Sequence, residues 1–291
     1  MEPGKGRSSK TGIRLGTAAA IVVLALLGSG VVLVSRSFAS LPKEPPSPRP
    51  DDKAVHTVLC LGDSLTRANI SADYVGELAR RLNGAGVSVI NGGENGDTVG
   101  DLAARLEVVL TGAPRLDVVT VLIGTNDANQ ALDAAGEKGS PESAVGAFRS
   151  EYADLIARLR ETANAAVVLI SIPPIGEKPD SPEWSQSERY ASEISGLAAD
   201  TGCRYVPFFE TLAALIETDP PDSERFPDHE DWEREMRRAV VHRLFKGVNY
   251  RAVGAASGYR YHSDQLHLNE DAAGILVDAL ERVVREEMAG R

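Results

Sequence analysis

The feature that most constrains the fold of this chain is an alternation of short apolar runs with segments of helical period, beginning near residue 55. Near-continuous hydrophobicity over such short runs is typical of parallel strands covered on both faces. Five runs rich in β-branched residues have this character: His56–Leu61, Val87–Asn91, Asp117–Ile123, Ala166–Ile172 and Arg204–Phe208. Apolar residues at helical spacing fill the intervals, at 73–82, 99–110, 143–161, 188–199 and 269–287.

This order predicts right-handed βαβ units and therefore a three-layer α/β/α sandwich around a doubly wound, parallel, five-stranded sheet of flavodoxin-like type. A chain of 291 residues, 43% of them hydrophobic, is long enough for one full-sized domain with a sizeable core. In such sheets, sites form where loops leave the carboxyl ends of the strands. We therefore expect the functional residues in those loops.

The N-terminal part of the chain differs from the rest. Residues 16–34 contain no charge, and 19 helical residues span about 28 Å, close to the thickness of a bilayer core. Four basic residues precede this run, which predicts a cytoplasmic N-terminus and an extracytoplasmic body. A cleaved signal peptide, which would lead to secretion, is the alternative. The predicted organisation is a basic N-terminus (1–14), a transmembrane signal-anchor or signal peptide (15–36), a proline-rich linker (37–54) and a folded domain (55–291).

The net charge of −11 is unevenly distributed, because residues 1–36 carry +4 and the remaining residues carry −15. An acidic body is repelled by nucleic-acid backbones, so neither DNA nor RNA is expected as a partner. The two cysteines, Cys60 and Cys203, do not have the spacing of a zinc site. No metal is expected at the acidic stretch 228–231 either, because it lacks a matching cluster of ligands.

Gly62-Asp63-Ser64-Leu65-Thr66 follows the first apolar run directly. Gly62 permits a tight turn, which would place Ser64 near the N-terminus of a short helix with its backbone N–H directed at a developing oxyanion. A simple helix cap is the alternative interpretation, since Asp and Ser are common N-cap residues.

Two further loops could donate hydrogen bonds to an oxyanion. "NGGENGDT" (91–98) leaves the second run, and Gly96 could offer an unshielded N–H there. "IGTNDAN" (123–129) leaves the third, and Asn126 offers a side-chain NH₂. Taken alone, each fits an ordinary glycine-rich loop or Asn-Asp turn.

"DQLHLN" (264–269) precedes the last helical segment and places Asp264 three residues before His267. A serine nucleophile needs a base within hydrogen-bond distance and a carboxylate that orients the imidazole. His262 is a rival base, but it has no carboxylate three residues before it. A capped helix start with a surface histidine is the simpler alternative.

Together, these four motifs resemble the SGNH/GDSL hydrolase family, over roughly Val55–Glu287. The resemblance implies that Ser64 is the nucleophile of a GDSL-type serine esterase or lipase and that Asp264 and His267 complete its triad. It also implies an oxyanion hole formed by Ser64, Gly96 and Asn126, an acyl-enzyme intermediate, and no cofactor. Leu268 departs from the pattern, because the family often has proline after the histidine.

The substrate is not fixed by these residues. A lipid ester, a lysophospholipid or a small acyl ester is one expectation, and a carbohydrate or cell-wall O-acetyl ester is another. An acyltransferase would use the same residues, and an inactive, membrane-tethered binding module is a further alternative. Three long loops, at 128–141, 173–188 and 210–264, are expected to shape the site. The last contains a predicted helix at 228–247 with an apolar stripe and a basic opposite face, which either contacts an anionic group or is solvated.

Overall fold

A computed structural model describes residues 54–111, 113, 115–133, 141–221 and 232–290. All of them belong to one unit of the chain, within Glu44–Arg291. The predicted basic N-terminus, the predicted membrane segment and, apart from Ala54, the predicted linker lie outside the described residues. Among the helices of the described ranges, none is both long and apolar enough to cross a membrane.

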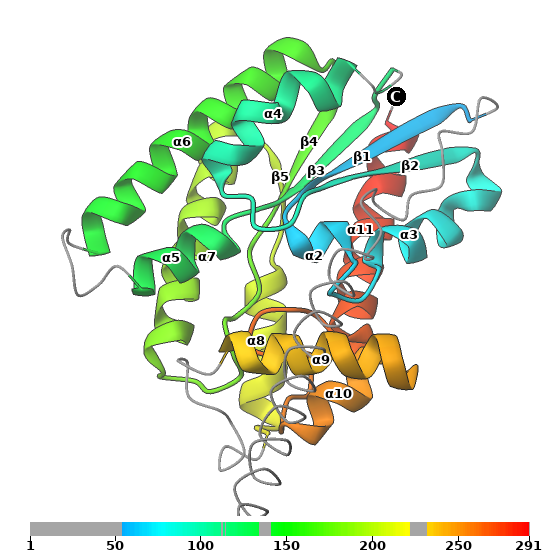
Figure 1. The fold of residues 1–291 in the computed structure, drawn as a ribbon. Helices are drawn as coiled ribbons and strands as arrows, with labels where there is room; N and C mark the ends of the chain where they lie inside the picture. Colours follow the sequence, from blue (N-terminus) through cyan, green and yellow to red (C-terminus); the bar gives the residue numbers. More distant parts are fainter. Residues whose placement is uncertain (1–53, 112, 114, 134–140, 222–231, 291) are drawn as a thin grey trace, which may run out of the picture. The chain divides into compact units, whose positions relative to one another are not determined.

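A parallel sheet in the order β2–β1–β3–β4–β5 forms the centre of the fold (Figure 1). Every neighbouring pair of strands is parallel, and Val58 of β1 lies opposite Val89 of β2 on one side and Val118 of β3 on the other. This strand order is the flavodoxin-like one. The predicted fold is therefore confirmed. The strands are β1 (His56–Gly62), β2 (Val87–Gly93), β3 (Val118–Leu122), β4 (Ala166–Ile170) and β5 (Arg204–Val206).

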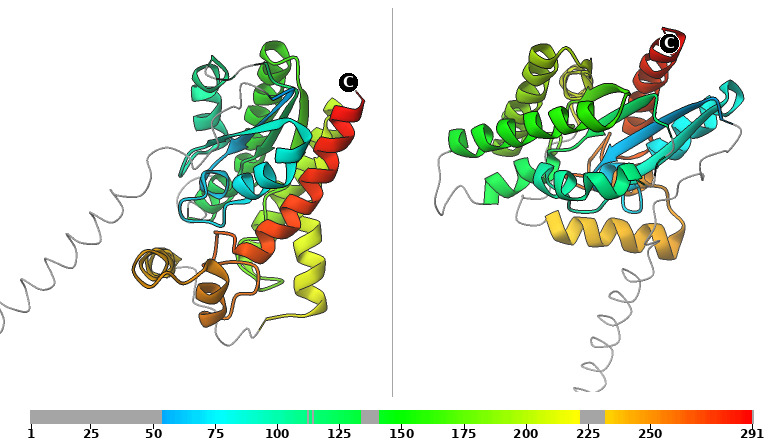
Figure 2. Two further views of the ribbon diagram at one scale, coloured as in Figure 1. Left: turned by 90° about the vertical axis from the view of Figure 1, so that its right-hand side faces the viewer. Right: turned by 90° about the horizontal axis from the view of Figure 1, so that it is seen from above.

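Helices cover both faces of the sheet, with α3 and α11 on one face and α4, α6 and α7 on the other (Figures 1 and 2). Helices α9 and α10 lie beyond the carboxyl ends of the strands. The helices are α2 (Ser64–Arg67), α3 (Tyr74–Leu82), α4 (Val99–Thr111), α5 (Thr125–Asp133), α6 (Pro141–Thr162), α7 (Pro182–Thr201), α8 (Phe208–Thr218), α9 (Trp232–Lys246), α10 (Tyr250–Ala256) and α11 (Glu270–Ala289), with a 3₁₀ turn at Asn83–Ala85.

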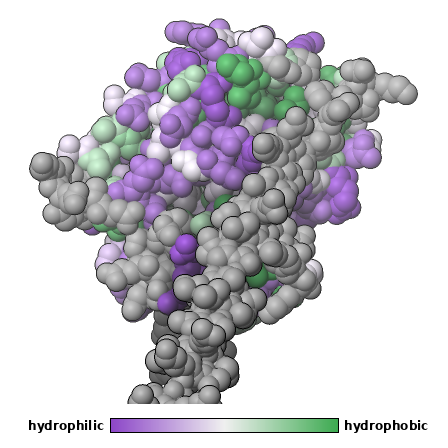
Figure 3. Space-filling view, viewed as in Figure 1, coloured by the Kyte–Doolittle hydropathy of each residue, from purple (hydrophilic) through white to green (hydrophobic). Residues whose placement is uncertain are grey.

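The core lies between the sheet and these helices. The interior residues of β1, β3 and β4 are almost all fully buried, as expected of strands covered on both faces. The surface shown in Figure 3 is mostly hydrophilic, with an apolar area toward the end of the molecule where α4 lies. Val108 of α4 is 76% exposed.

Three strands are shorter than the apolar runs that predicted them, and β3 is shorter by one residue at each end. β4 and β5 each end two residues before their run does. Pro173 follows the first run, and Pro207 interrupts the second. Proline has no N–H to give to a sheet ladder, so the strands stop before it.

The segments predicted to be long loops contain helices. The start of α7, most of α8 and all of α10 fall within them, as does most of α5. Local capping explains two of these helix starts: the Ser181 side chain accepts the Trp184 N–H at the start of α7, and Asn249 accepts the Ala252 N–H at the start of α10. The expectation of long irregular loops was wrong in these places.

The helix predicted at 228–247 is present as α9, Trp232–Lys246. Val240 of its apolar stripe is buried, whereas Arg234, Arg237 and Arg238 of its basic face are exposed. Arg238 also contacts Glu235, which is buried, at 3.4 Å. Contact of this face with an anionic group stays a prediction.

Candidate active site

The turn from β1 into α2 places Ser64 at the carboxyl edge of the sheet. Ser64 is the first residue of α2, and Asp63 caps the helix by accepting the Leu65 N–H at 2.9 Å. A side chain at Gly62 would collide with Thr66 and with a backbone carbonyl of β3, so only glycine allows α2 to follow the strand this closely. The first N–H groups of a helix have no partner inside it, which leaves the Ser64 N–H available to a ligand.

Ser64, His267 and Asp264 form one chain of hydrogen bonds. Ser64 Oγ lies 3.1 Å from His267 Nε2, and His267 Nδ1 lies 2.9 Å from Asp264 Oδ2. Asp264 Oδ1 also accepts the backbone N–H groups of Leu266 and His267, each at 2.8 Å, which fixes the carboxylate within its own loop. The structure thus brings together the three residues predicted as a triad, with the serine and the carboxylate on opposite nitrogens of the ring.

The environment of this pair favours a charged imidazole. Burial lowers the pKa of His267, but the charge of Asp264 and the hydrogen bond to it, together with the charge of Asp63, raise this pKa above its ordinary value. Burial conversely raises the pKa of Asp264, and the charge and hydrogen bonds of His267 outweigh it, so the pKa of Asp264 lies below its usual range. The imidazolium that forms when the ring accepts a proton is therefore stabilised.

Asp63 is a buried carboxyl group beside the triad, and sequence reasoning assigned it only a capping role. Its Oδ2 atom is buried and has no hydrogen-bond partner among the described residues. Burial raises the pKa of Asp63 to about 7, against the lowering effects of the Leu65 N–H and of His267. Asp63 therefore changes its charge near neutral pH, next to the nucleophile.

Gly96 and Asn126, the other two predicted oxyanion donors, lie on neighbouring loops. Gly96 is exposed in the β2–α4 loop with a φ of +81°, a conformation that favours glycine. Asn126 was expected in a loop, but it lies in the first turn of α5, where its Nδ2 donates to the Asp97 carbonyl at 2.8 Å. Among the described residues, neither Gly96 nor Asn126 is hydrogen-bonded to Ser64 or His267.

Two arginines tie the loops of this edge together, and sequence reasoning did not identify either. Arg105 donates to Asp97 at 2.5 Å and to the Gly62 carbonyl at 3.1 Å, so it joins the β2–α4 loop to the end of β1. Arg67 of α2 pairs with Glu94 of the same loop at 2.5 Å. These ion pairs hold the Gly96 loop against the helix that carries Ser64.

Leu268 has a structural role that the proline common in the family would not fill. Its backbone N–H donates to Ser71 Oγ at 3.2 Å, and its carbonyl accepts the Ala72 N–H at 2.9 Å. Leu268 also pairs with His262 in an isolated antiparallel bridge. Because proline has no N–H, it would lose the bond to Ser71.

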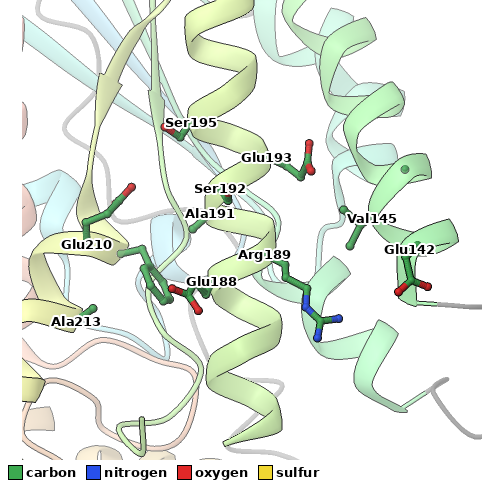
Figure 4. A pocket seen from close by; sticks show the side chains of 12 residues that line it. Glu142, Val145, Glu188, Arg189, Ala191, Ser192, Glu193, Ser195, Glu210 and Ala213 are labelled. Atoms are coloured by element: carbon green, nitrogen blue, oxygen red, sulfur yellow. The ribbon is translucent and has the colours of Figure 1, made fainter. Parts of the chain in front are cut away.

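A groove of about 890 Å³ lies on the outer side of α7, between α6 and α8 (Figure 4). It contains none of the predicted site residues, and Glu142, Glu188, Arg189, Glu193 and Phe209 are among those that line it. Within the described ranges, no cluster of three or more His, Cys, Asp or Glu side chains is arranged to hold a metal ion. Cys60 and Cys203 are both free thiols.

Comparison with known proteins places this geometry in a family. Residues 60–274 match the GDSL-like Lipase/Acylhydrolase family. A search of curated proteins finds no match.

Solved structures give the same fold at low sequence identity. An alpha/beta hydrolase enzyme from the metagenome of Lake Arreo, Spain, is 18% identical, with a TM-score of 0.55 over 78% of this chain and 94% of that one. An acetylxylan esterase from Geobacillus stearothermophilus is 17% identical, with a TM-score of 0.55 over 79% and 94%. A further acetyl xylan esterase, AlAXEase, is 21% identical, with a TM-score of 0.51 over 78% and 99%.

The family match spans most of the chain and begins within β1, just before Ser64, and the solved structures share the five-stranded sandwich. The chain belongs to the GDSL-like lipase/acylhydrolase family and is a hydrolase of ester bonds.

Proposed function

We propose that the protein is a serine esterase in which Ser64 is the nucleophile, His267 the general base and Asp264 the group that orients the imidazole. The observation that carries this proposal is the 3.1 Å contact between Ser64 Oγ and His267 Nε2, with Asp264 bound to the opposite ring nitrogen. His267 accepts the serine proton as Oγ attacks the ester carbonyl, and then returns it to the departing alcohol. Water, activated by the same histidine, releases the acid from the acyl-enzyme.

The backbone N–H groups of Ser64 and Gly96 and the side-chain NH₂ of Asn126 are proposed to stabilise the oxyanion. One hydrogen of the Asn126 amide is used by the Asp97 carbonyl, which orients the group and leaves the second hydrogen for substrate. Donors fixed before the reaction stabilise the transition state without reorganisation. The ion pairs of Arg105 and Arg67 support this arrangement by holding the Gly96 loop in place.

The proposed substrate is an O-acetylated carbohydrate rather than a long-chain lipid ester. Two of the structurally similar proteins are acetylxylan esterases. The loop beside Ser64 is polar and exposed at Glu94 and Asn95, which suits a hydroxyl-rich ligand better than an acyl chain.

The experiment compares the full chain, purified in mild detergent, with its Ser64→Ala variant on p-nitrophenyl esters from acetate to palmitate and on acetylated xylan. We expect turnover that is highest on acetate and lost in Ser64→Ala. A Ser171→Ala variant is the control, because it removes a buried serine hydroxyl that bonds the Phe209 N–H rather than the triad. A folded wild-type chain that is inert on all esters and unreactive toward a fluorophosphonate would overturn the proposal. A profile that peaks on palmitate would overturn only the substrate.

The proposed location is the outer side of a membrane, with the uncharged run 16–34 as the anchor. Carbonate extraction of membranes from expressing cells tests it. An anchored protein stays in the pellet and is degraded by protease added outside the cell. Recovery of the intact chain from the soluble fraction contradicts this location.

A further inference from the structure

Glu177 is a buried carboxylate in the loop that follows β4, and it contacts a segment more than 80 residues away in the sequence. Its side chain is 1% exposed. Oε2 accepts the Arg260 N–H at 2.8 Å, and Oε1 accepts the N–H groups of Tyr261 at 2.7 Å and His262 at 2.9 Å. His262 Nδ1 lies 2.8 Å from the same Oε1, so one carboxylate holds three consecutive backbone groups and a buried ring.

These three residues form one arm of the loop that carries the proposed base. Across that loop His262 pairs with Leu268, the Ser263 N–H donates to the His267 carbonyl at 2.8 Å, and the Asn269 N–H donates to the Tyr261 carbonyl at 2.9 Å. Asp264 and His267 lie between the two paired arms. A displacement of residues 260–262 is therefore transmitted to both.

A second contact links the same two segments. The Gly176 N–H donates to the Gln265 carbonyl at 2.8 Å, one residue from Asp264. The loop after β4 thus contacts the 260–269 loop at two places. Glu177 binds the backbone of residues 260–262, and Gly176 binds Gln265.

The bonding pattern at Glu177 requires an ionised carboxylate. Burial raises the pKa of Glu177, but the hydrogen bond and charge of His262 and the N–H groups of Arg260 and Tyr261 outweigh it, so this pKa lies below the ordinary value. Glutamine has nearly the same shape, but its NH₂ group would face an N–H donor at one of the two oxygen positions. At least one of the backbone bonds would then be lost.

We propose that Glu177 is a positioning residue. By binding the backbone of residues 260–262, it holds the Asp264–His267 pair at the position from which His267 contacts Ser64. His262 is the buried partner of Glu177 and not a second catalytic base, because its ring is fully buried and its Nε2 has no hydrogen-bond partner among the described residues, whereas Nε2 of His267 contacts Ser64 Oγ. The inference rests on the proposed function of the triad.

The test compares Glu177→Gln with Asp117→Asn in the full chain. Asp117 is a matched control, because it is also 1% exposed and accepts a backbone N–H, that of Thr57, but it lies at the amino ends of the strands. We expect kcat on p-nitrophenyl acetate to fall roughly 10- to 100-fold in Glu177→Gln with KM within about twofold, because small displacements of catalytic groups reduce the rate and not ground-state binding. Asp117→Asn should leave kcat within about twofold, because its bond to the Thr57 N–H lies at the end of the sheet opposite Ser64.

A spectroscopic readout separates this inference from the proposed function. The Nδ1 proton shared by His267 and Asp264 is expected as a downfield ¹H resonance, which can be recorded even if no ester is turned over. It should shift or broaden in Glu177→Gln and be retained in Asp117→Asn. His262→Asn removes the resonance of the other histidine and so identifies each signal. Wild type that shows the resonance but no esterase activity would count against the proposed function and leave the positioning role supported.

Two results would overturn the proposal: a folded Glu177→Gln protein with unchanged kcat and an unshifted His267 resonance, or equal losses of kcat in Glu177→Gln and Asp117→Asn. If Glu177→Gln does not fold, Glu177→Asp takes its place. That variant keeps the charge but withdraws the carboxylate from the three N–H groups, so a lower kcat at unchanged KM is again expected. Unchanged kcat in folded Glu177→Asp would then overturn the proposal.

Discussion

Asp63 and Ser64 are adjacent in the chain, yet only the serine contributes an atom to the proposed triad. Asp63 instead affects the triad through its charge, which raises the pKa of His267. The Asp63 carboxyl group is fully buried. The esterase reaction requires the neutral form of His267, so the rate should rise with pH through the pKa of that ring. The residue beside the nucleophile therefore influences the pH at which the enzyme becomes active.

Replacing Asp63 by Asn should move the acidic limb of the kcat/KM profile to lower pH. The variant keeps an oxygen for the Leu65 N–H but removes a negative charge that favours the imidazolium, so the pKa of His267 falls. The measurement is a profile from pH 5 to 9 on p-nitrophenyl acetate. An unchanged limb, or a shift to higher pH, would contradict this account.

Asn126→Ala should reduce kcat far more than it changes KM. Removing one oxyanion donor typically costs about 10²- to 10³-fold in kcat, and the variant also releases the Asp97 carbonyl that the amide binds. Gln130→Ala is the matched control, because it removes an exposed amide from the same helix α5. A loss below about threefold in Asn126→Ala, or equal losses in both variants, would remove Asn126 from the oxyanion hole.

At the scale of elements, the segment before α11 is attached to the α2–α3 connection by a bond that depends on Leu268 not being proline. Ser71 Oγ accepts the Leu268 N–H, and both residues are buried. Ser71→Ala leaves that N–H without its partner, which should lower the free energy of unfolding by about 1–3 kcal/mol.

The double variant tests this bond directly. In a Leu268→Pro background there is no N–H to satisfy, so Ser71→Ala should cost at least about 1 kcal/mol less than in the wild-type chain. Urea unfolding of the four proteins gives the coupling energy. Additive effects would show that the 3.2 Å contact contributes nothing to stability.

The elements also show what could and could not be predicted from the sequence. Strand positions followed from the apolar runs, because buried parallel strands have few polar residues. Much of α8 and all of α10 were missed, since short helices give little periodic signal and Asn249, which caps α10, fell within a segment predicted as a loop. The residues of the proposed triad were predicted from motif spacing, but the pairing of His262 with Glu177 was not, because 85 residues separate them and only the packing of two loops brings them together.

At the scale of the whole molecule, the α/β/α arrangement concentrates buried acidic groups at one edge of the sheet. Asp63, Asp97 and Asp127 all lie in loops or first turns at the carboxyl ends of strands. Burial is the largest cause of a raised pKa in each, and it raises the pKa of Asp127 to about 6. Burial therefore opposes the ionisation of these three carboxyl groups at the edge that holds the proposed active site.

This arrangement predicts that the folded state is less stable at pH 8 than at pH 5.5. A carboxyl group with a raised folded-state pKa binds its proton more tightly when folded, so stability falls as pH rises from the unfolded-state value toward the folded one. For Asp63 that window runs from 3.8 to about 7, and for Asp127 from 3.8 to about 6. His267 acts in the same direction, because stability from its raised pKa is lost as pH rises through the folded-state value.

Urea unfolding between pH 5 and 8.5 measures the effect, and Asp63→Asn isolates one contribution. The difference of about three pKa units at Asp63 corresponds to at most about 4 kcal/mol, so the variant should gain stability relative to wild type as pH rises and reach a plateau above about pH 7. Glu77→Gln should show no such gain between pH 5 and 8.5, because hydrogen bonds from Arg80 and Arg81 lower the pKa of Glu77 to about 2, well below this range. Parallel stability curves for wild type and Asp63→Asn would mean that the Asp63 carboxyl does not titrate in this range and is better solvated than its burial implies.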